Sequence, residues 1–150
     1  MRSRASRSDP RSIPPMSQEN VDVVLEQFAA TNAREFPRAM RLYAEDVELV
    51  VNHDAFLRGG TFTGREAVGA WFADWFSTFE PGYRFEIVEA RDLGDVVFLD
   101  AAHSGRGRNS GIEVTGRTGY LYTVRDGLIA RAELYRSPDE ALAAAAAARE

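Results

Sequence analysis

The sequence predicts an α+β domain in which N-terminal helices cover one face of a curved antiparallel sheet. Helical periodicity dominates the first half of the chain, and extended segments separated by turn residues dominate the second half. The last helix before these strands carries a dense row of aromatic side chains on one face. Because helices contact only part of the concave face of a strongly bent sheet, this arrangement leaves a conical hollow.

Composition sets the outer limits. At 150 residues the chain has the length of one domain with its own core. Cysteine is absent, so there is no disulfide framework or thiolate metal site, and we expect a cytoplasmic protein. A net charge of −5 argues against nucleic acid as a partner. No apolar run reaches the roughly 18 residues of a membrane span, so no membrane partner is expected.

The first 15 residues differ in composition from the rest. They combine arginine, serine and proline with almost no large apolar side chains. Such a segment cannot bury enough surface to order itself, so residues 1–15 are interpreted as a disordered extension or an upstream start. A weak tether to an anionic surface is the alternative. Residues 16–150 are then the domain, which begins naturally at Met16.

The first helices and strand follow from local signals. Ser17 is a suitable cap for a helix over residues 18–32. Pro37 suits the first turn of a short second helix, which we expect to end near Ala44. The segment 47–52 is rich in valine and predicts a strand.

The aromatic helix is the most informative element. The Gly59–Gly60 pair indicates a loop, and Thr63 with Glu66 then matches a capping box. Apolar side chains recur at helical spacing after this cap, at Val68, Trp71, Phe72, Trp75, Phe76 and Phe79. Aromatic side chains this dense either fill a core or line a cavity.

Four extended segments form the expected meander, and a helix follows them. Asp126–Gly127 is a strong hairpin signal between the last two strands. Ser137, Pro138 and Glu140 predict a capped, alanine-rich final helix from about residue 138 that frays toward the C-terminus. The expected strands are residues 83–91, 95–104, 112–125 and 128–136.

Several phrases in this order resemble the SnoaL-like branch of the nuclear transport factor 2-like superfamily. They are SQENVDVV, LYAEDVEL, FTGREAVGAWF, NSGIEV and VRDGLIARAELYRSPDEAL, and together they extend over residues 16–143. The resemblance implies a cone-shaped α+β barrel with an apolar pocket, commonly a homodimer through the outer sheet face. Relatives include polyketide cyclases, ketosteroid isomerase, limonene epoxide hydrolase, scytalone dehydratase and non-catalytic binding proteins, so the fold alone does not fix the function.

Strand alternation selects the residues that face the hollow. Along residues 95–104, Leu99 and His103 share a face with other apolar side chains, which makes that face the better interior, while Asp100 lies on the other. Glu133 likewise alternates with Leu134, and we expect both carboxylates to face outward.

Alignment with the enzymes of the superfamily gives only partial matches. His103 falls near one catalytic carboxylate of the epoxide hydrolase, but Ala101 replaces its arginine and Leu134 its second aspartate. The base position of ketosteroid isomerase falls near Val51, which cannot remove a proton. Its acidic donor corresponds to Tyr120, and its tyrosine falls near Gln27. The two predicted catalytic residues are therefore His103 and Tyr120.

Each predicted site residue also has a structural explanation. His103 could bond a backbone carbonyl or Tyr120, and the strand tyrosines could be core residues with satisfied hydroxyls. Trp71 and Trp75 could simply pack in the core. The cluster Asn52–His53–Asp54 could be a solvated loop near the cone mouth. The expected ligand-binding set is Phe28, Asn52, Trp71, Trp75, Leu99, Thr118, Tyr122 and Leu134.

Three functions remain open at this point. The first is an enzyme of the cyclase, isomerase or hydrolase kind, in which Tyr120 bonds a carbonyl or enolate oxygen and His103 moves the proton. The second is a binding module for a small apolar, oxygen-bearing molecule. The third is a structural dimer whose cavity is filled by side chains. No cofactor and no metal is expected, because two histidines far apart supply too few ligands.

Overall fold

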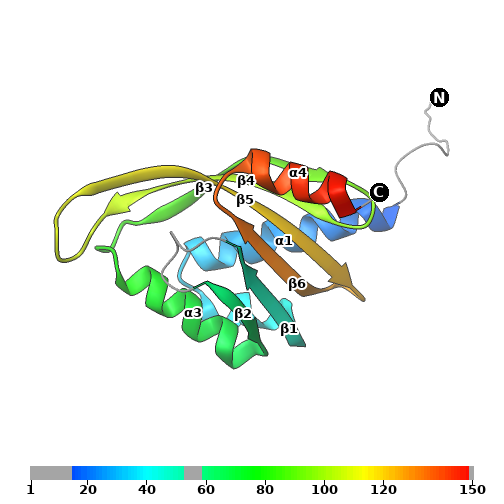
Figure 1. The fold of residues 1–150 in the computed structure, drawn as a ribbon. Helices are drawn as coiled ribbons and strands as arrows, with labels where there is room; N and C mark the ends of the chain where they lie inside the picture. Colours follow the sequence, from blue (N-terminus) through cyan, green and yellow to red (C-terminus); the bar gives the residue numbers. More distant parts are fainter. Residues whose placement is uncertain (1–14, 53–58, 149–150) are drawn as a thin grey trace.

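The computed structural model describes residues 15–52 and 59–148, with side chains from residue 18 onward (Figure 1). Nearly all of the predicted N-terminal extension, and the predicted loop residues His53 and Asp54, lie outside the described residues. The described elements form helices on the two faces of one curved, six-stranded sheet. The predicted α+β fold class is confirmed.

Ten elements follow one another along the described part of the chain. Two helices open it, a strand pair and a helix come next, and four strands and a last helix complete it. Their bounds are α1 (Pro15–Asn32), α2 (Phe36–Arg41), β1 (Tyr43–Val51), β2 (Gly60–Thr63), α3 (Arg65–Ser77), β3 (Arg84–Asp92), β4 (Val97–Arg106), β5 (Glu113–Arg125), β6 (Leu128–Tyr135) and α4 (Pro138–Ala148).

The sheet order is β2-β1-β6-β5-β4-β3. The last four strands form the predicted antiparallel meander, and each of their ends lies within two residues of its expected position. Asp126 and Gly127 both have positive φ, 55° and 78°, as a type I′ hairpin requires. The sheet is mixed rather than wholly antiparallel, because β1 pairs with β6 in parallel. The whole meander separates these two strands in the sequence, so hairpin signals could not reveal their pairing.

Several helix boundaries differ from the expected ones. The helix α1 begins at Pro15 rather than at residue 18, and α2 ends at Arg41, so that Tyr43 already belongs to β1. The capping box predicted at Thr63 is wrong. Thr63 ends β2, and Gly64, with a φ of 95°, is the N-cap of α3 without a side-chain bond. The Gly64 N–H donates to Val47 O, so strand pairing with β1 sets where α3 starts.

The N-terminus of α4 agrees better with its sequence signal. Pro138 is the first helical residue, and the Glu140 N–H donates to Ser137 Oγ over 3.2 Å. Only this half of the capping box forms, because the Glu140 carboxylate pairs with Arg136 instead.

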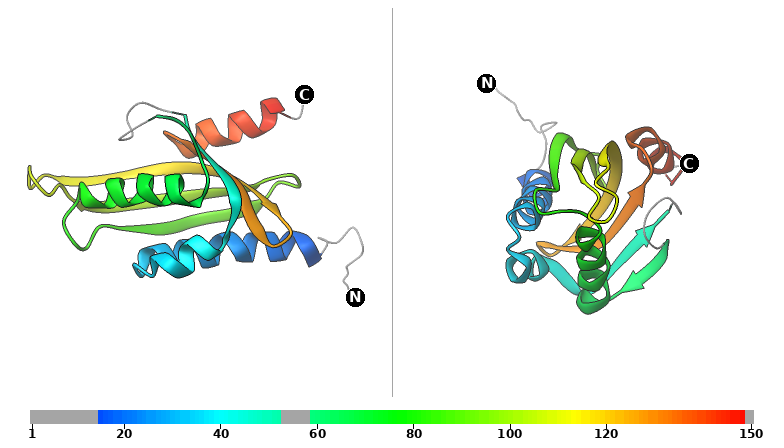
Figure 2. Two further views of the ribbon diagram at one scale, coloured as in Figure 1. Left: turned by 90° about the horizontal axis from the view of Figure 1, so that it is seen from below. Right: turned by 90° about the vertical axis from the view of Figure 1, so that its left-hand side faces the viewer.

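Helices cover the two faces of the sheet at different places (Figures 1 and 2). The helices α1 and α3 lie on the concave side, and α4 lies on the convex side over β4 and β5. The predicted strand faces are confirmed on β4, where Leu99 belongs to the concave core while Phe98 packs under α4. Asp100 shares the convex face but is 6% exposed, because it pairs with Arg117 beside α4. Asp100 therefore faces outward from the concave core, as predicted, although Arg117 and α4 cover it there.

Candidate functional site

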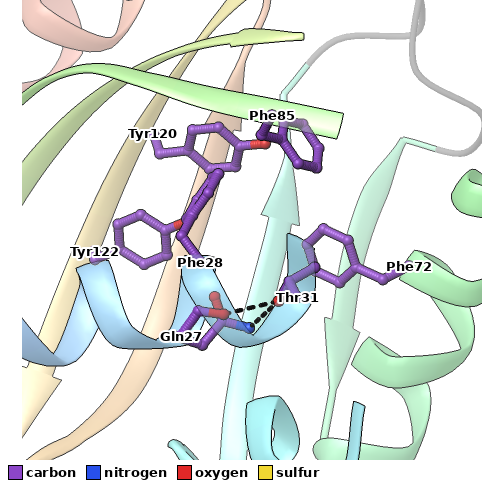
Figure 3. Close-up of a pocket in the computed structure, with 7 residues that line it drawn as sticks. All are labelled: Gln27, Phe28, Thr31, Phe72, Phe85, Tyr120 and Tyr122. Carbon is purple, nitrogen blue, oxygen red and sulfur yellow. Dashed lines mark hydrogen bonds between the residues drawn. The ribbon is translucent and has the colours of Figure 1, made fainter. Parts of the chain in front are cut away.

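The concave interior contains two small cavities, separated by side chains that line both. Figure 3 shows the residues that line one of them. Each cavity has a volume of about 10 Å³, which is room for one water molecule. The tyrosine cavity is further lined by Gln27, Phe28, Thr31 and Tyr122, and the tryptophan cavity by Trp71, Trp75, Tyr83, Thr118 and Leu134. The shared side chains are Phe72, Phe85 and Tyr120. The described residues thus enclose two water-sized cavities in place of the ligand-sized hollow expected from the sequence.

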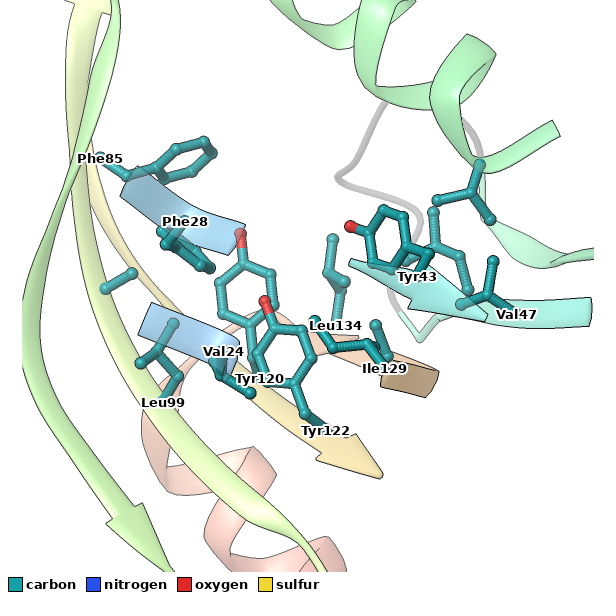
Figure 4. Close-up of a cluster of buried hydrophobic side chains, with 14 of the residues drawn as sticks. Val24, Phe28, Tyr43, Val47, Phe85, Leu99, Tyr120, Tyr122, Ile129 and Leu134 are labelled. Atoms are coloured by element: carbon teal, nitrogen blue, oxygen red, sulfur yellow. The ribbon is translucent and has the colours of Figure 1, made fainter. Parts of the chain in front are cut away.

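Tyr120 and Tyr122 form the polar part of this apolar interior. Their rings stack on neighbouring positions of β5, with centroids 5.6 Å apart and planes within 9°. Both residues are 2% exposed, and Phe28 of α1 packs edge-on against both rings. Figure 4 shows the two hydroxyls on the same side of the stack. Neither hydroxyl has a hydrogen-bond partner among the residues that the structure describes.

A buried polar group on α1 closes the tyrosine cavity. Gln27 Nε2 donates to Thr31 Oγ1 over 3.1 Å and to Tyr43 Oη over 3.0 Å. Because Gln27 and Thr31 are four residues apart, they lie on the same face of α1. The Tyr43 hydroxyl is therefore satisfied, unlike those of Tyr120 and Tyr122.

A second polar group joins three elements at the tryptophan cavity. Trp75 Nε1 donates to Tyr83 Oη over 2.9 Å, and Tyr83 Oη lies 3.2 Å from His103 Nδ1. Since the Tyr83 oxygen accepts from Trp75, its own proton is available for Nδ1, which leaves the imidazole proton on Nε2. Tyr83 is 1% exposed, whereas His103 is only partly buried.

Burial shifts the pKa of each of these groups toward the neutral form. It raises the pKa of Tyr120 and Tyr122 well above the usual value of 10.0, and it raises that of Tyr83 although Trp75 and Arg34 oppose the shift. It lowers the pKa of His103 below 6.5. Near neutral pH the tyrosines are therefore hydrogen-bond donors, and His103 is an uncharged base.

The model of the SnoaL-like domain family matches residues 24–132, which include every element from within α1 to β6. The chain belongs to the SnoaL-like family. The resemblance seen in the sequence is therefore confirmed. A search of curated protein sequences gave no match.

Solved structures share the fold of this SnoaL-like domain at low sequence identity. TerC, co-crystallised with polyporic acid, has a TM-score of 0.69 at 22% identity, over 81% of this chain and 94% of its own. A protein from Catenulispora acidiphila with a ketosteroid isomerase-like fold, in complex with trimethylamine, has a TM-score of 0.67 at 24% identity. The match covers 81% of this chain and 90% of that protein. A protein from a Jannaschia species, described as a SnoaL-like polyketide cyclase, has a TM-score of 0.73 at 19% identity. The match covers 83% of this chain and 89% of that protein.

The SnoaL-like domain brings most of the predicted site residues together. Seven of them line the two cavities, namely Phe28, Trp71, Trp75, Thr118, Tyr120, Tyr122 and Leu134. Leu99 is fully buried in the core but lines neither cavity. Asn52 is exposed at the end of β1, where its N–H donates to Leu134 O. His103 lines neither cavity, but its ring contacts Tyr83 and Phe85, which do.

Sequence reasoning missed Tyr83, Phe85 and Gln27. Tyr83 and Phe85 have the alternating spacing of one strand face, but Tyr83 follows the Pro81–Gly82 turn and gives no separate signal. Gln27 and Thr31 could have been found from their helical spacing.

In the described parts of the chain, no cluster of three His, Asp or Glu side chains is placed to hold a metal ion. Among the same residues, no helix has the length and apolarity needed to cross a membrane.

The buried imidazole predicts a pH dependence of folding. Because the folded pKa of His103 lies below 6.5, the unfolded chain binds more protons at this residue as the pH falls. Stability is therefore expected to decrease as the pH falls through 6.5 and to level off below the folded pKa. Urea unfolding of wild type and His103→Gln between about pH 5 and pH 8 measures this. A wild-type slope that His103→Gln retains in full would contradict it.

Proposed function

We propose that this SnoaL-like domain binds a small, mainly apolar molecule that carries a hydrogen-bond-accepting oxygen. The observation that supports this most strongly is the pair of buried Tyr120 and Tyr122 hydroxyls, which have no partner within residues 15–52 and 59–148. Buried polar groups are nearly always hydrogen-bonded, since an unsatisfied one costs about 1–3 kcal/mol. A bound oxygen would satisfy both donors, while Phe28 and Phe85 would contact the apolar part of the molecule.

The relatives are consistent with this proposal. The structures of TerC with polyporic acid and of the Catenulispora acidiphila protein with trimethylamine show that this fold admits small organic molecules. Of these two, polyporic acid has the chemistry that buried phenols would recognise, because its oxygens accept hydrogen bonds. A carbonyl or enol oxygen on an aromatic or alicyclic skeleton is therefore the ligand class that we favour here.

The two cavities must merge to admit such a ligand. The two cavities are separated by the side chains of Phe72, Phe85 and Tyr120. Phe72 is the partition that can move most easily, because it is only partly buried and stands on α3, whereas Phe85 and Tyr120 stand on paired strands. We infer that rotation of Phe72 joins the cavities into one ligand-sized space.

The test compares two probes with one carbon skeleton. Indane and 1-indanone differ by a ketone oxygen, so the difference between their affinities measures the polar contact. We expect 1-indanone to bind about tenfold more tightly, which corresponds to one hydrogen bond of about 1.4 kcal/mol. Titration followed by the fluorescence of Trp71 and Trp75 measures both affinities. Equal affinities, or no binding of either probe, would contradict the proposed function.

Phe72→Ala tests the partition. Removing this side chain is expected to join the cavities and to strengthen binding of 1-indanone several-fold, because no rotation is then needed. Stability should fall by about 1–3 kcal/mol, less than for a fully buried phenylalanine. Phe36→Ala is the matched control, since Phe36 contacts α3 through Phe76 and lines neither cavity. Unchanged or weaker binding in Phe72→Ala would show that Phe72 is not the partition.

The geometry gives less support to direct proton transfer by His103. A ligand oxygen at Tyr120 would lie inside the cavities, whereas His103 lines neither of them and reaches their wall through Tyr83 and Phe85.

The homodimer implied by the family resemblance remains a proposal. It is favoured by the exposed apolar side chains of Ile87 and Val88 on β3, which are 39% and 53% exposed. Sedimentation equilibrium tests it, and a monomer at all concentrations would exclude it.

A further inference from the structure

The tyrosine cavity contains a buried hydrogen-bond acceptor besides its two hydroxyl donors. Gln27 is 4% exposed and lines this cavity together with Tyr120 and Tyr122 (Figure 3). Its Nε2 donates to Thr31 and to Tyr43, so both amide protons are used. Its Oε1 has no hydrogen-bond partner among the residues that the structure describes. A buried carbonyl oxygen left in this way is as unfavourable as an unsatisfied hydroxyl.

Thr31 fixes the orientation of the Gln27 amide. The Thr31 hydroxyl donates its single proton to the backbone oxygen of Gln27 over 2.9 Å. Thr31 Oγ1 can therefore only accept from the Gln27 side chain, and the amide atom 3.1 Å away must be the nitrogen. The opposite orientation would place two acceptors side by side. Oε1 is thus the amide atom that remains available to a ligand.

The two tyrosine hydroxyls are spaced for one shared oxygen atom. The ring planes are nearly parallel with centroids 5.6 Å apart, and Figure 4 shows both hydroxyls on the same side of the stack. An oxygen midway between hydroxyls with this separation lies about 2.8 Å from each, the usual O···O distance of a hydrogen bond. Burial, Tyr120 and Tyr43 raise the pKa of Tyr122, so its hydroxyl also lies near the hydroxyl that Gln27 bonds.

We propose that the ligand carries a hydroxyl group, which the tyrosine cavity recognises through Tyr120, Tyr122 and Gln27. This inference rests on the proposed function and narrows its ligand class to an alcohol or an enol. A hydroxyl oxygen accepts two hydrogen bonds and donates one. Its lone pairs accept from the two tyrosines, and its proton goes to Gln27 Oε1. A ketone oxygen can accept from both tyrosines, but it leaves Gln27 Oε1 unsatisfied.

The sizes of the two cavities agree with this placement. The tyrosine cavity, at about 10 Å³, has room for one group the size of a water molecule or a hydroxyl. The hydrocarbon skeleton then extends past Phe72 into the tryptophan cavity, beside Trp71 and Trp75. A water molecule in the tyrosine cavity would make the same three hydrogen bonds. A ligand hydroxyl replaces such a water without loss, whereas a ketone gives up the bond to Gln27.

The preference for an alcohol over a ketone tests this inference. 1-Indanol and 1-indanone share one skeleton and differ in whether the oxygen carries a proton. We expect the better-bound enantiomer of 1-indanol to bind about fivefold more tightly, since it makes one further hydrogen bond. Titration followed by tryptophan fluorescence measures the ratio. Equal affinities, or tighter binding of the ketone, would overturn the inference, while the comparison of 1-indanone with indane still decides the proposed function.

Replacing Gln27 tests the source of the preference. Gln27→Met keeps a side chain of similar length without the oxygen, so the ratio of the two affinities should fall to about one. Gln18→Met is the matched control, because Gln18 is exposed on the same helix, where it bonds Asp22 four residues on. It should keep the wild-type ratio. If Gln27→Met also keeps that ratio, the ligand proton bonds another group and the inference is overturned.

The Gln27 carbonyl gives an independent measurement in the wild-type protein. The sequence contains two glutamines, so their ¹³Cδ resonances are assigned with Gln18→Met. Saturating 1-indanol should shift the Gln27 resonance downfield, as hydrogen bonding to a carbonyl does, and 1-indanone should shift it less. An equal shift with both probes, or none with 1-indanol, overturns the inference. If Gln27→Met fails to fold, this shift and the wild-type ratio still decide. If indane, 1-indanone and 1-indanol all fail to bind, the cavity takes up water only, which contradicts the proposed function as well.

Discussion

Replacing both Tyr120 and Tyr122 with phenylalanine is expected to stabilise the ligand-free protein and to abolish its preference for oxygen-bearing ligands. The two hydroxyls are buried without partners among the described residues, so their removal relieves a desolvation cost. We expect a gain of about 1–2 kcal/mol in the free energy of unfolding for each replacement. Urea unfolding of the single and double variants measures this gain.

The same replacements should remove the difference between the two probes. Indane makes only apolar contacts, so its affinity should change little. 1-Indanone loses its donors, and its affinity should fall about tenfold, to the level of indane. The combination of higher stability and weaker binding is typical of residues kept for function rather than for folding.

Tyr43→Phe is the matched control for this experiment. Tyr43 is equally buried, but its hydroxyl accepts a hydrogen bond from Gln27. Its removal leaves a buried amide with one partner fewer and should destabilise the protein by about 1 kcal/mol. If the double variant is destabilised, as Tyr43→Phe is, then the Tyr120 and Tyr122 hydroxyls are satisfied in the ligand-free protein. The proposed binding role would then lose its main support.

Sequence patterns predicted the elements of this fold well because each depends on local chemistry. The alternation on β4 placed Leu99 and Phe98 on the correct faces, and the Asp126–Gly127 turn set the β5–β6 register. The parallel pairing of β1 with β6 could not be predicted in this way, since it depends on a contact between distant segments. The predicted start of α3 was wrong because a backbone hydrogen bond from Gly64 to β1 outweighed the capping signal at Thr63.

The sequence predicted which site residues face the interior, but not which of them lie close to one another. Alternation and helical spacing placed Trp71, Tyr120 and Tyr122 in the interior. The same rule placed His103 on the concave face, but it could not show that Tyr83 lies between His103 and the cavity. Nor could it show that the hollow is divided, because cavity volume depends on the rotamers of Phe72 and Phe85, which no sequence pattern encodes.

Gly119→Ala is expected to destabilise the protein strongly, although it adds a single methyl group. A Cβ on Gly119 would lie 2.6 Å from Ser137 O, 2.7 Å from Pro138 Cα and 2.8 Å from Ala141 Cβ. Two of these three atoms belong to the backbone, so a side-chain rotation cannot relieve the overlap. The N-terminal turn of α4 must therefore move away from β5 and uncover Phe98 and Leu121.

The expected cost of Gly119→Ala is about 3 kcal/mol, at the upper end for overpacking. Gly69→Ala provides a control of the opposite sign. Gly69 lies inside α3, where alanine favours the helix by up to about 1 kcal/mol, and its added Cβ would meet only the flexible Met40 Sδ at 3.2 Å. Urea unfolding ranks the variants, and amide hydrogen exchange should show faster exchange in α4 for Gly119→Ala. If Gly119→Ala is as stable as Gly69→Ala, then α4 does not seat against β5 as described, because only that contact makes the added methyl group costly.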